Sequence, residues 1–469
     1  MRIRVLGQYL QTTVGALALT ECVVFVATFY GAIMTRFGLN LNDLQAFERA
    51  VGLLLPRAIL FSVVMVISLL AFGLYSARQR APVAGLFIRG GAALTVAVSL
   101  MAAALYILPG LWIDRGVVAI AALSAIPAAA LLRLFFYRVV DENLFKRRVL
   151  IYGSGTHATA ITRLRRRSDR QGFLIVGFVQ AADEVCALPS HQLLDMQHNL
   201  IDLCGARRVD EVVVAMDDRR RGFPTEELLQ CRFRGVQVTE LPTFLERETG
   251  RVRMDVIRPS WMIFADGFKG GALRMISSRA LDLLVSSLIL LSALPVMLLT
   301  AIAIKLEDGW RAEVFYRQKR VGLAGRTFYI LKFRSMRMDA EHNGSAVWAQ
   351  RGDPRVTQVG ALIRKLRIDE LPQILNVFRG CMSFVGPRPE RPQFVTEFAE
   401  KIPYYVLRHC VKPGITGWAQ LCYPYGSSER DALEKLQYDL YYVKNKSLLF
   451  DLAILVQTVE VVLLGKGAR

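Results

Sequence analysis

Two adjacent acidic residues, Asp369 and Glu370, stand at the start of an apolar helical pattern in the stretch LRIDELPQILNVFRGCMSFVGPRPERP. Neighbouring carboxylates repel each other, so a cation is needed beside them if both are to be ionised. A carboxylate can act as a nucleophile in phosphoryl transfer, because the acyl phosphate that it forms is itself reactive. A carboxylate beside a pyrophosphate also suits Mg²⁺, whose octahedral shell is usually completed by phosphate oxygens and water. By itself, an acid pair at a helix N-terminus is most simply a complement to the helix dipole.

Arginines are the residues that could balance this negative charge. Arg364 comes about one helical turn before Asp369, and Arg388 stands in the Gly-Pro-Arg-Pro turn downstream. The arginine fork can hold two phosphate oxygens at once. Pro387 and Pro389 stiffen the turn that presents Arg388. We therefore predict that both arginines lie at the acid pair, where they can also meet phosphate.

Composition places part of the chain in a membrane. The protein has 469 residues, of which 53% are hydrophobic, and a formal net charge of +19. Such a chain is too long for one compact domain and too apolar for an ordinary soluble protein. The basic residues lie beside apolar runs and no nucleic-acid-binding motif is recognisable, which favours a membrane surface and phosphate over nucleic acid as partners. The seven cysteines show no zinc-site spacing and are expected to be reduced thiols.

Four apolar segments, residues 14–34, 58–75, 90–108 and 117–137, come first, and each is near the ~20 residues that a helix needs to cross hydrocarbon. We expect four transmembrane helices within residues 1–140. The first segment lacks a small-residue cleavage site, so it is an anchor and not a signal peptide. Basic residues precede the first helix and follow the second and fourth, which places the N-terminus and everything after the fourth helix in the cytosol. These residues are Arg2, Arg4, Arg78, Arg80, Arg89, Lys146, Arg147 and Arg148.

Glu21 falls inside the first apolar segment. A buried acid is costly in a membrane, so it needs a structural partner or a function. We expect pairing between helices, with a transport role as the alternative, because a single acid makes no pathway.

After the fourth segment the pattern changes to a β-branched strand, a glycine turn and a helix, RRVLIYGSGTHATAITRLRRRSD. This order is typical of a Rossmann-like unit, which we place at residues 141–262. Gly153 and Gly155 would leave backbone N–H groups free for a phosphate. The next strand, however, ends with Gln180 where a dinucleotide site would have an acid, and Asp183 comes late. A scaffold without a catalytic dinucleotide is favoured over a working cofactor site.

A further apolar run, residues 283–304, is long enough to span but has Pro295 near its middle, where proline kinks a helix. Basic residues flank it on both sides, which indicates that both ends stay on the cytosolic face. We therefore predict a re-entrant helical hairpin at about residues 280–305, bent at Pro295, with an ordinary kinked span as the alternative. The C-terminal apolar run carries Asp451 and Glu460 and is expected to lie in or near the interface, not to span.

Several motifs follow in succession: EVFYRQKRVGLAGRTFYILKFRSM, the acid pair, HCVKPGITGWAQ and EKLQYDLYYVKN. Together they resemble the bacterial sugar transferase family, the polyprenyl-phosphate glycosyl-1-phosphate transferases. The resemblance covers residues 274–469, and the order of the three parts is similar to that of the long-form members. It implies a mixed membrane protein with a four-helix transmembrane bundle, a Rossmann-like α/β cytosolic domain, and a mainly α-helical monotopic catalytic domain at residues 263–469 that contains the re-entrant helix.

The resemblance implies transfer of a sugar 1-phosphate from a UDP-sugar to undecaprenyl phosphate, with release of UMP, through a covalent aspartyl phosphosugar intermediate. This reaction would initiate exopolysaccharide or O-antigen repeat-unit synthesis. Asp369 is implied as the nucleophile and Glu370 as the ligand of a catalytic Mg²⁺. The residues implied to meet nucleotide or carrier phosphates are Lys332, Arg334, Arg364, Arg388, Arg408 and Lys412, and those with a uridine or metal role are Gln420 and Asp439.

The resemblance further implies a multi-pass protein of the bacterial inner membrane, with the catalytic and Rossmann-like domains on the cytosolic face. A homo-oligomer, for example a dimer, is expected as well. Two positions depart from the family pattern: Arg367, where many small members have serine, and Cys381, where an acid is common. Neither departure removes a proposed catalytic group.

Two other functions stay open. A membrane-anchored NAD-dependent nucleotide-sugar dehydratase or epimerase would need a Tyr-x-x-x-Lys pair in its dinucleotide domain, but the pair found, Tyr442 and Lys446, lies far downstream. A non-enzymatic polysaccharide-assembly scaffold would be indifferent to loss of Asp369. No residue set identifies the sugar.

Overall fold

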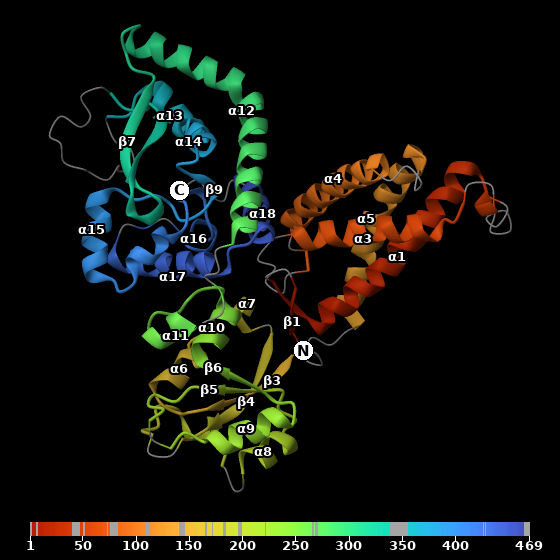
Figure 1. The fold of residues 1–469 in the computed structure, drawn as a ribbon, viewed down its shortest axis with the longest axis vertical. Coiled ribbons are helices and arrows are strands. Elements are labelled where there is room, and N and C mark those ends of the chain that lie inside the picture. The colour runs from red at the N-terminus through yellow and green to blue at the C-terminus, as the bar shows by residue number, and fades with distance from the viewer. Residues whose placement is uncertain are drawn as a thin grey trace. The chain divides into compact units, whose positions relative to one another are not determined.

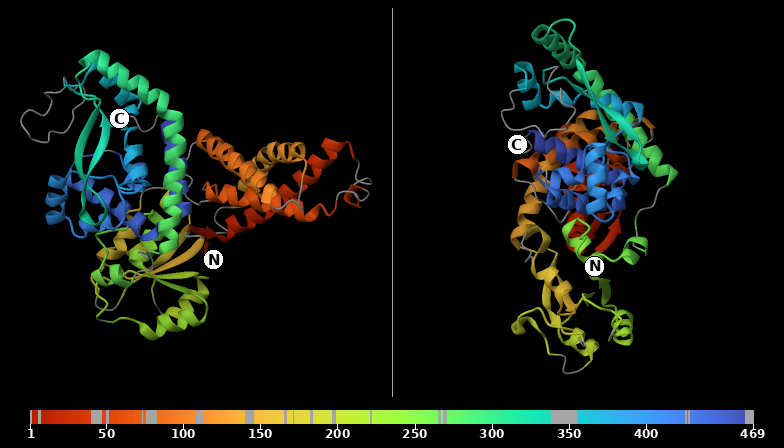
Figure 2. Two further views of the ribbon diagram at one scale, coloured as in Figure 1. Left: turned by 45° about the horizontal axis from the view of Figure 1, so that its top comes forward. Right: turned by 90° about the vertical axis from the view of Figure 1, so that its left-hand side faces the viewer.

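The computed structural model describes residues 2–5, 8–39, 47–49, 52–72, 74–75, 83–107, 113–139, 146–164, 167–170, 172–181, 184–195, 199–220, 222–264, 267, 271–337, 355–424, 426 and 428–463. The chain divides into two compact units, Met1–Ala265 and Asp266–Arg469 (Figures 1 and 2). Each unit has its own clusters of buried apolar side chains.

Apolar helices form the first part of the first unit. They are α1 (Thr12–Phe37), α3 (Leu55–Ala71), α4 (Val83–Ile107) and α5 (Arg115–Val139), and a hairpin of β1 (Arg2–Val5) and β2 (Gln8–Gln11) precedes them. The four predicted segments are thus helical. By length and apolar character α1, α4 and α5 can cross a membrane, whereas α3 is shorter. α1 packs against α3 and α5 (Figure 1). Arg78 and Arg80, which the predicted orientation uses, lie outside the described residues.

Glu21 of α1 is fully buried in this bundle. Its carboxylate accepts hydrogen bonds from Arg133 of α5, whose Nε lies 2.5 Å from Oε1 and whose Nη2 lies 3.1 Å from Oε2, and from the Tyr75 hydroxyl. The Arg133 guanidinium also lies over the Tyr75 ring, 5.2 Å from its centroid. The predicted pairing between helices is confirmed, and a buried acid matched in this way does not leave an uncompensated charge.

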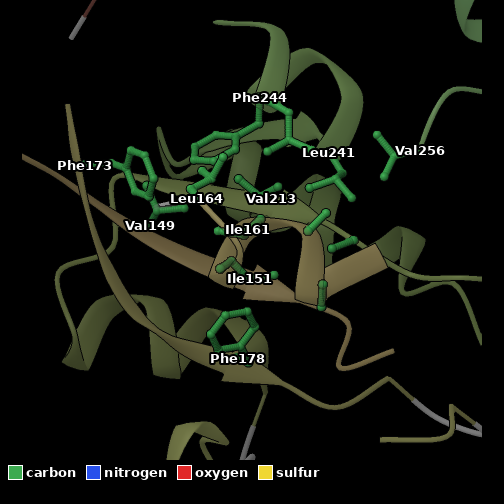
Figure 3. Close-up of a cluster of buried hydrophobic side chains, with 14 residues drawn as sticks. Val149, Ile151, Ile161, Leu164, Phe173, Phe178, Val213, Leu241, Phe244 and Val256 are labelled. Atoms are coloured by element: carbon green, nitrogen blue, oxygen red, sulfur yellow. The ribbon is translucent and has the colours of Figure 1, made fainter. Parts of the chain in front are cut away.

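The first unit continues in a parallel four-stranded sheet with the strand order β4-β3-β5-β6. Buried apolar side chains cover both faces of the sheet, as expected for strands joined by helical crossovers. On one face, Leu241 and Phe244 of α10 pack over Ile161 and the strands (Figure 3). The strands are β3 (Arg147–Tyr152), β4 (Phe173–Val179), β5 (Glu211–Val214) and β6 (Gln237–Glu240). The helices are α6 (Thr156–Thr162), α7 (Arg167–Arg170), η2 (Ser190–Gln192), α8 (Leu200–Ala206), α9 (Thr225–Phe233), α10 (Leu241–Thr249) and α11 (Pro259–Phe264).

The second unit begins with α12 (Ala272–Asp308), a helix of 37 residues with Pro295 inside it. At ~1.5 Å per residue such a helix is about 55 Å long, which exceeds the ~30 Å of hydrocarbon in a bilayer. It contains the candidate span Arg274–Asp308 and is bent in Figure 1. The backbone is helical across Pro295, so this segment is one continuous helix that is bent along its length. Large apolar side chains are exposed along it, among them Leu284, Leu288, Leu291 and Leu299.

Two side chains of α12 fasten it to the rest of the second unit. Arg279 donates hydrogen bonds to the carbonyl oxygens of Val377 and Phe378, both at 2.7 Å. Asp282, one turn further along, is buried and accepts hydrogen bonds from the Ser383 hydroxyl at 2.9 Å and the Phe384 N–H at 3.0 Å.

The remaining elements of the second unit are short. The antiparallel hairpin of β7 (Phe315–Val321) and β8 (Thr327–Phe333) is closed by η3 (Leu323–Gly325), and β9 (Ser383–Val385) pairs in parallel with β10 (Gly414–Thr416). The C-terminal run forms a helix, α18, that is shorter than a membrane span. The other helices are α13 (Gln358–Lys365), η4 (Ile368–Glu370), α14 (Gln373–Arg379), α15 (Pro392–Lys401), η5 (Tyr405–Cys410), α16 (Trp418–Cys422), α17 (Glu429–Asn445) and α18 (Leu448–Leu463).

Candidate active site

The acid pair lies on a single 3₁₀ turn between two short helices. After α13 ends, Arg367 reverses the chain with a left-handed backbone at φ 60°, and η4 then carries both carboxylates before α14 begins. The acids therefore precede the apolar helix by one turn and are not part of it. A left-handed residue other than glycine costs of order 1–3 kcal/mol, so neighbouring contacts must hold this turn in place.

Asn376 of α14 supplies such contacts. Its Oδ1 accepts a hydrogen bond from the Leu331 N–H at 3.0 Å, and its Nδ2 donates to the Tyr329 carbonyl at 2.7 Å. Both partners belong to β8, the strand that also carries Lys332. α14 and the acids before it are thereby held against β8. Asn376 is not among the residues predicted from the sequence, although an amide inside an apolar helical pattern was a signal that could have found it.

Glu370 is held by two cations. Its Oε1 lies 3.0 Å from Lys332 Nζ and 3.1 Å from Arg388 Nη2. Burial alone would raise the pKa of the Glu370 carboxyl, but Arg388 and Lys332 more than offset it and hold the pKa well below its usual range. Burial lowers the pKa of Lys332, and Glu370 opposes that shift. The predicted relief of acid-pair repulsion by neighbouring cations is confirmed for Glu370.

Asp369 has a different environment. Its carboxylate accepts no hydrogen bond from any residue that the structure describes. Burial raises the pKa of the Asp369 carboxyl, the charge of Lys332 opposes this, and the charge of Glu370 adds to it. The charge of Arg367 and, more weakly, that of Arg364 also lower the Asp369 pKa, but no ion pair joins Arg364 to either acid among the described residues. One acid is thus fixed by cations, while its neighbour keeps its oxygens available.

The Gly-Pro-Arg-Pro turn is fixed to the segment that follows η5. The Gly386 N–H donates to the Thr416 carbonyl and the Gly414 N–H donates to the Pro387 carbonyl, both at 2.9 Å. The two segments touch backbone to backbone, because a Cβ added to Gly386 would lie 2.4 Å from the Lys412 carbonyl oxygen. Glycine is therefore required at this crossing, and the turn is a rigid mount for Arg388.

Arg408 and Asp439 lie behind this turn as a buried ion pair. Arg408 is 5% exposed and Asp439 is 2% exposed. Arg408 Nη2 lies 2.8 Å from Asp439 Oδ2 and donates to the Arg388 carbonyl at 3.0 Å, while Nη1 donates to the Tyr405 hydroxyl at 2.8 Å. These contacts use both ends of the guanidinium within the protein. The pair supports the turn from behind, although the sequence analysis expected Arg408 to meet phosphate and Asp439 to meet uridine or metal.

Among the described residues, no hydrogen bond or ion pair joins three other predicted residues to the acid pair. Arg334 is paired with Glu313, with Nη2 3.0 Å from Oε2. Lys412 lies within the electrostatic reach of Arg279 and Asp282 at the start of α12, and burial lowers its pKa. Gln420 is exposed on α16. The structure therefore brings together Asp369, Glu370, Lys332 and Arg388, with Arg364 close by.

Comparison with known proteins identifies the family of this chain. Residues 273–465 match the family described as bacterial sugar transferase. A UDP-glucose:undecaprenyl-phosphate glucose-1-phosphate transferase of Xanthomonas campestris pv. campestris is 31% identical over 368 residues, which are 76% of this chain and 74% of that protein. The chain belongs to the bacterial sugar transferase family. The acid pair, Lys332 and Arg388 all lie within the matched residues.

Other bacterial sugar transferases are also similar. A UDP-N-acetylgalactosamine-undecaprenyl-phosphate N-acetylgalactosaminephosphotransferase of Aeromonas hydrophila is 41% identical over 266 residues, which are 56% of this chain and 62% of that protein. The match thus spans somewhat less than two thirds of the Aeromonas protein. An undecaprenyl-phosphate glucose phosphotransferase of Komagataeibacter xylinus is 33% identical over 338 residues, which are 69% of this chain and 60% of that protein. Long-form relatives therefore differ in the sugar that their names state.

The donor set at the acid pair fits Mg²⁺ held mainly by substrate. No group of three or more His, Cys, Asp or Glu side chains that could enclose a metal is found among the described residues. Mg²⁺ does not need such a cage, because it commonly binds through one or two carboxylates plus substrate phosphates and water. Since Lys332 and Arg388 both contact Oε1 of Glu370, the second oxygen of Glu370 and the Asp369 carboxylate are the donors that fit such an ion.

The glycine turn of the parallel sheet, by contrast, is filled by the chain's own carboxylates. A Cβ added to Gly155 would lie 2.4 Å from Asp217 Oδ2 and 2.7 Å from Glu184 Oε1. These two acids accept hydrogen bonds of 2.7–2.8 Å from the backbone N–H groups of Ser154, Thr156 and His157. The backbone N–H groups that a dinucleotide phosphate would need as hydrogen-bond donors already bind these two carboxylates, and the carboxylates would repel a phosphate. This favours the scaffold interpretation of the Rossmann-like unit.

Proposed function

We propose that this protein transfers a sugar 1-phosphate from a UDP-sugar to undecaprenyl phosphate and releases UMP, and that this reaction initiates exopolysaccharide or O-antigen repeat-unit synthesis. The observation that carries the proposal is the arrangement at η4, where Glu370 is fixed by Lys332 and Arg388 beside an Asp369 carboxylate without a hydrogen-bond partner among the described residues. The names of the Xanthomonas and Aeromonas relatives support the same reaction class. They state two different sugars, so the donor sugar has to be found by assay.

Two displacements at phosphorus account for the reaction. Asp369 attacks the sugar-bearing phosphorus of the donor, an Asp–phosphate bond forms, and the bond to the UMP oxygen breaks. A phosphate oxygen of undecaprenyl phosphate then attacks the same phosphorus and releases the Asp369 carboxylate. Lys332 and Arg388 hold and neutralise the phosphates, since charge stabilisation dominates phosphoryl transfer. A Mg²⁺ held by Glu370 and the donor phosphates would supply further neutralisation.

The membrane arrangement belongs to the same proposal. The helices within residues 1–140 anchor the chain, the Rossmann-like unit comprises residues 141–262, and the catalytic domain comprises residues 263–469. α12 enters the cytosolic leaflet, bends and returns, which keeps both cytosolic parts on one side. The length and bend of α12, its exposed leucines and the basic residues on both flanks support this topology. We also propose that the protein forms a homo-oligomer in the bacterial inner membrane. The mass of the detergent-solubilised particle tests this, because it would exceed the mass of one chain.

The donor assay tests the reaction class. Purified protein in nanodiscs with Mg²⁺, undecaprenyl phosphate and a panel of UDP-sugars is expected to release UMP with one or a few donors. The same preparation is expected to contain no bound NAD and to show no rise of its unfolding temperature with NAD. Bound NAD, together with no UMP release from any donor, would reverse the choice in favour of a dehydratase or epimerase.

Replacement of Lys332 by methionine should move the acidic limb of the pH profile of kcat/KM to higher pH. The Lys332 charge lowers the pKa of Asp369 against the effect of burial. Without it the pKa rises, so more of the nucleophile is protonated at a given acidic pH, and activity is lost earlier as pH falls. Lys365→Met, which removes an exposed charge from α13, is the matched control and should leave the limb in place. An unmoved limb in Lys332→Met would contradict the assignment.

A further inference from the structure

The hairpin of β7 and β8 presents two different faces. Along β7, three side chains are exposed, Phe315, Arg317 and Lys319, and they alternate with three half-buried ones, Tyr316, Gln318 and Arg320. Tyr316 is in register with Lys332 on β8. Directly opposite residues of antiparallel strands share one face of the sheet. The half-buried row therefore lies on the face from which Lys332 reaches Glu370.

Hydrogen bonds link this row side chain to side chain. Gln318 Nε2 donates to the Tyr316 hydroxyl at 3.2 Å, and Arg320 Nη2 donates to Gln318 Oε1 at 2.6 Å. Arg320 Nη1 then donates to the Pro389 carbonyl at 3.1 Å and lies 3.6 Å from Glu390 Oε2. The row thus begins beside Lys332 and ends in the Gly-Pro-Arg-Pro turn.

Two arginines hold consecutive carbonyl groups of that turn. Arg320 binds the carbonyl of Pro389 from the hairpin side, and Arg408 binds the carbonyl of Arg388 from behind. The guanidinium of Arg388 itself points the other way and meets Glu370. Side-chain contacts therefore run from Lys332 to Glu370 and Arg388, and from the Pro389 carbonyl through Arg320 and Gln318 to Tyr316, which pairs with Lys332 through the strand register.

We propose that Arg320 is a positioning residue for the transfer reaction, which sets the distance between the Arg388 guanidinium and the Lys332 ammonium. This rests on the proposed function, because that distance matters only if both cations receive phosphate oxygens of one substrate. Without the Arg320 side chain the turn keeps its bond to Arg408 and the backbone bond from the Val321 N–H to the Glu390 carbonyl at 3.0 Å. It loses the side-chain contacts of Arg320 with Pro389 and Glu390, which are the ones that continue along the half-buried row toward Lys332. A displacement of about 1 Å in such a site can cost about 10²-fold in rate. The loss should appear in kcat and much less in KM, because the cations still attract the donor.

A double-mutant cycle of Arg320→Ala and Arg388→Ala tests the proposal. The rate of UMP release is measured in single turnovers with enzyme in excess, so that slow variants remain measurable. Arg320→Ala alone should slow release at least about tenfold. In the Arg388→Ala background the same change should slow it less than about twofold, because both residues act through one guanidinium. Arg320→Lys, which keeps one donor, should recover part of the rate.

Lys319→Ala is the matched control, since it removes a cation from the exposed face of the same strand. Equal losses from Arg320→Ala in both backgrounds, or a loss no larger than that of Lys319→Ala, would overturn the proposal. Amide hydrogen exchange gives a readout that does not need activity: the amides of Gly386, Arg388, Glu390 and Arg391 should exchange faster in Arg320→Ala and Arg320→Lys than in Lys319→Ala. Unchanged exchange would overturn the proposal as well, whereas failure of the proposed function would show as no UMP release by the wild type from any donor.

Discussion

The Asp369→Asn variant is expected to release UMP at least about 10³-fold more slowly than the wild type, because an amide cannot form the acyl phosphate that divides the transfer into two displacements. Asparagine has nearly the same shape, and no hydrogen bond to this carboxylate is found among the described residues, so the fold should survive. The measurement is UMP release in nanodiscs at saturating donor. Intact-protein mass spectrometry without acceptor should also find a phosphosugar adduct on the wild type and none on the variant.

Glu397→Gln is the control for this experiment. Glu397 forms an exposed pair with Lys401 on α15, at 2.8 Å, so its loss removes one carboxylate far from the chemistry and should leave turnover within twofold. If Asp369→Asn kept its turnover and still trapped a phosphosugar, another group would have to be the nucleophile.

The second large effect is expected from Glu370→Gln, which should lower kcat about 10²-fold and raise the Mg²⁺ concentration needed for half-maximal activity at least about tenfold. The variant removes the charge on which Lys332 and Arg388 converge, together with a donor for the ion. A Mg²⁺ titration of initial rates measures both changes. Unaltered Mg²⁺ dependence would remove Glu370 from the metal site.

For Glu370→Gln we also predict the direction in which the pH profile of kcat/KM moves. The negative charge of Glu370 raises the pKa of Asp369, so its neutralisation lowers that pKa. The nucleophile then stays ionised to lower pH, and the acidic limb of kcat/KM should move to lower pH, opposite to the shift expected for Lys332→Met. Movement of both limbs in the same direction would contradict the electrostatic account of the pair.

Local sequence was a good guide to the acid pair and to Arg388. The two acids are neighbours in the chain, and the prolines on either side of Arg388 restrict the backbone of its turn. The bundle likewise required some partner for Glu21, because an acid in apolar surroundings must be matched. That the partner is Arg133, 112 positions away, depends on which helices pack together, and apolar periodicity alone does not determine this.

The surroundings of Arg408 and Asp439 could not be predicted from local patterns. Both are charged and stand in motifs rich in basic and polar residues, so binding of substrate was the natural expectation. The structure buries them as a pair because η5 and α17 pack together, and a buried charge must be paired. Arg320 illustrates the reverse case. Its alternation with exposed Arg317 and Lys319 becomes informative only once β8 shows which face Lys332 occupies.

The Rossmann-like unit adds a lesson about spacing. An acid for a nucleotide ribose was sought near the end of the second strand, where Gln180 stands, and Asp183 lies outside the described residues. Glu184, the next residue, reaches back to the Ser154 N–H at 2.7 Å. An acid that follows the second strand too far along the chain to bind a ribose can thus occupy the N–H groups of the glycine turn.

With α12 in the membrane as proposed, the bonds from Arg279 and Asp282 of this helix determine how far the acid pair lies from the lipid tails. Arg279 holds the end of α14, and Asp282 holds the start of β9, and these two segments lead directly to the acid pair and to the Arg388 turn. The proposed acceptor phosphate is attached to a long apolar chain, so the reaction would have to take place at the level in the bilayer where that phosphate lies. Because these side-chain bonds join α12 to both segments, the helix cannot move up or down in the bilayer without moving the acid pair by the same amount.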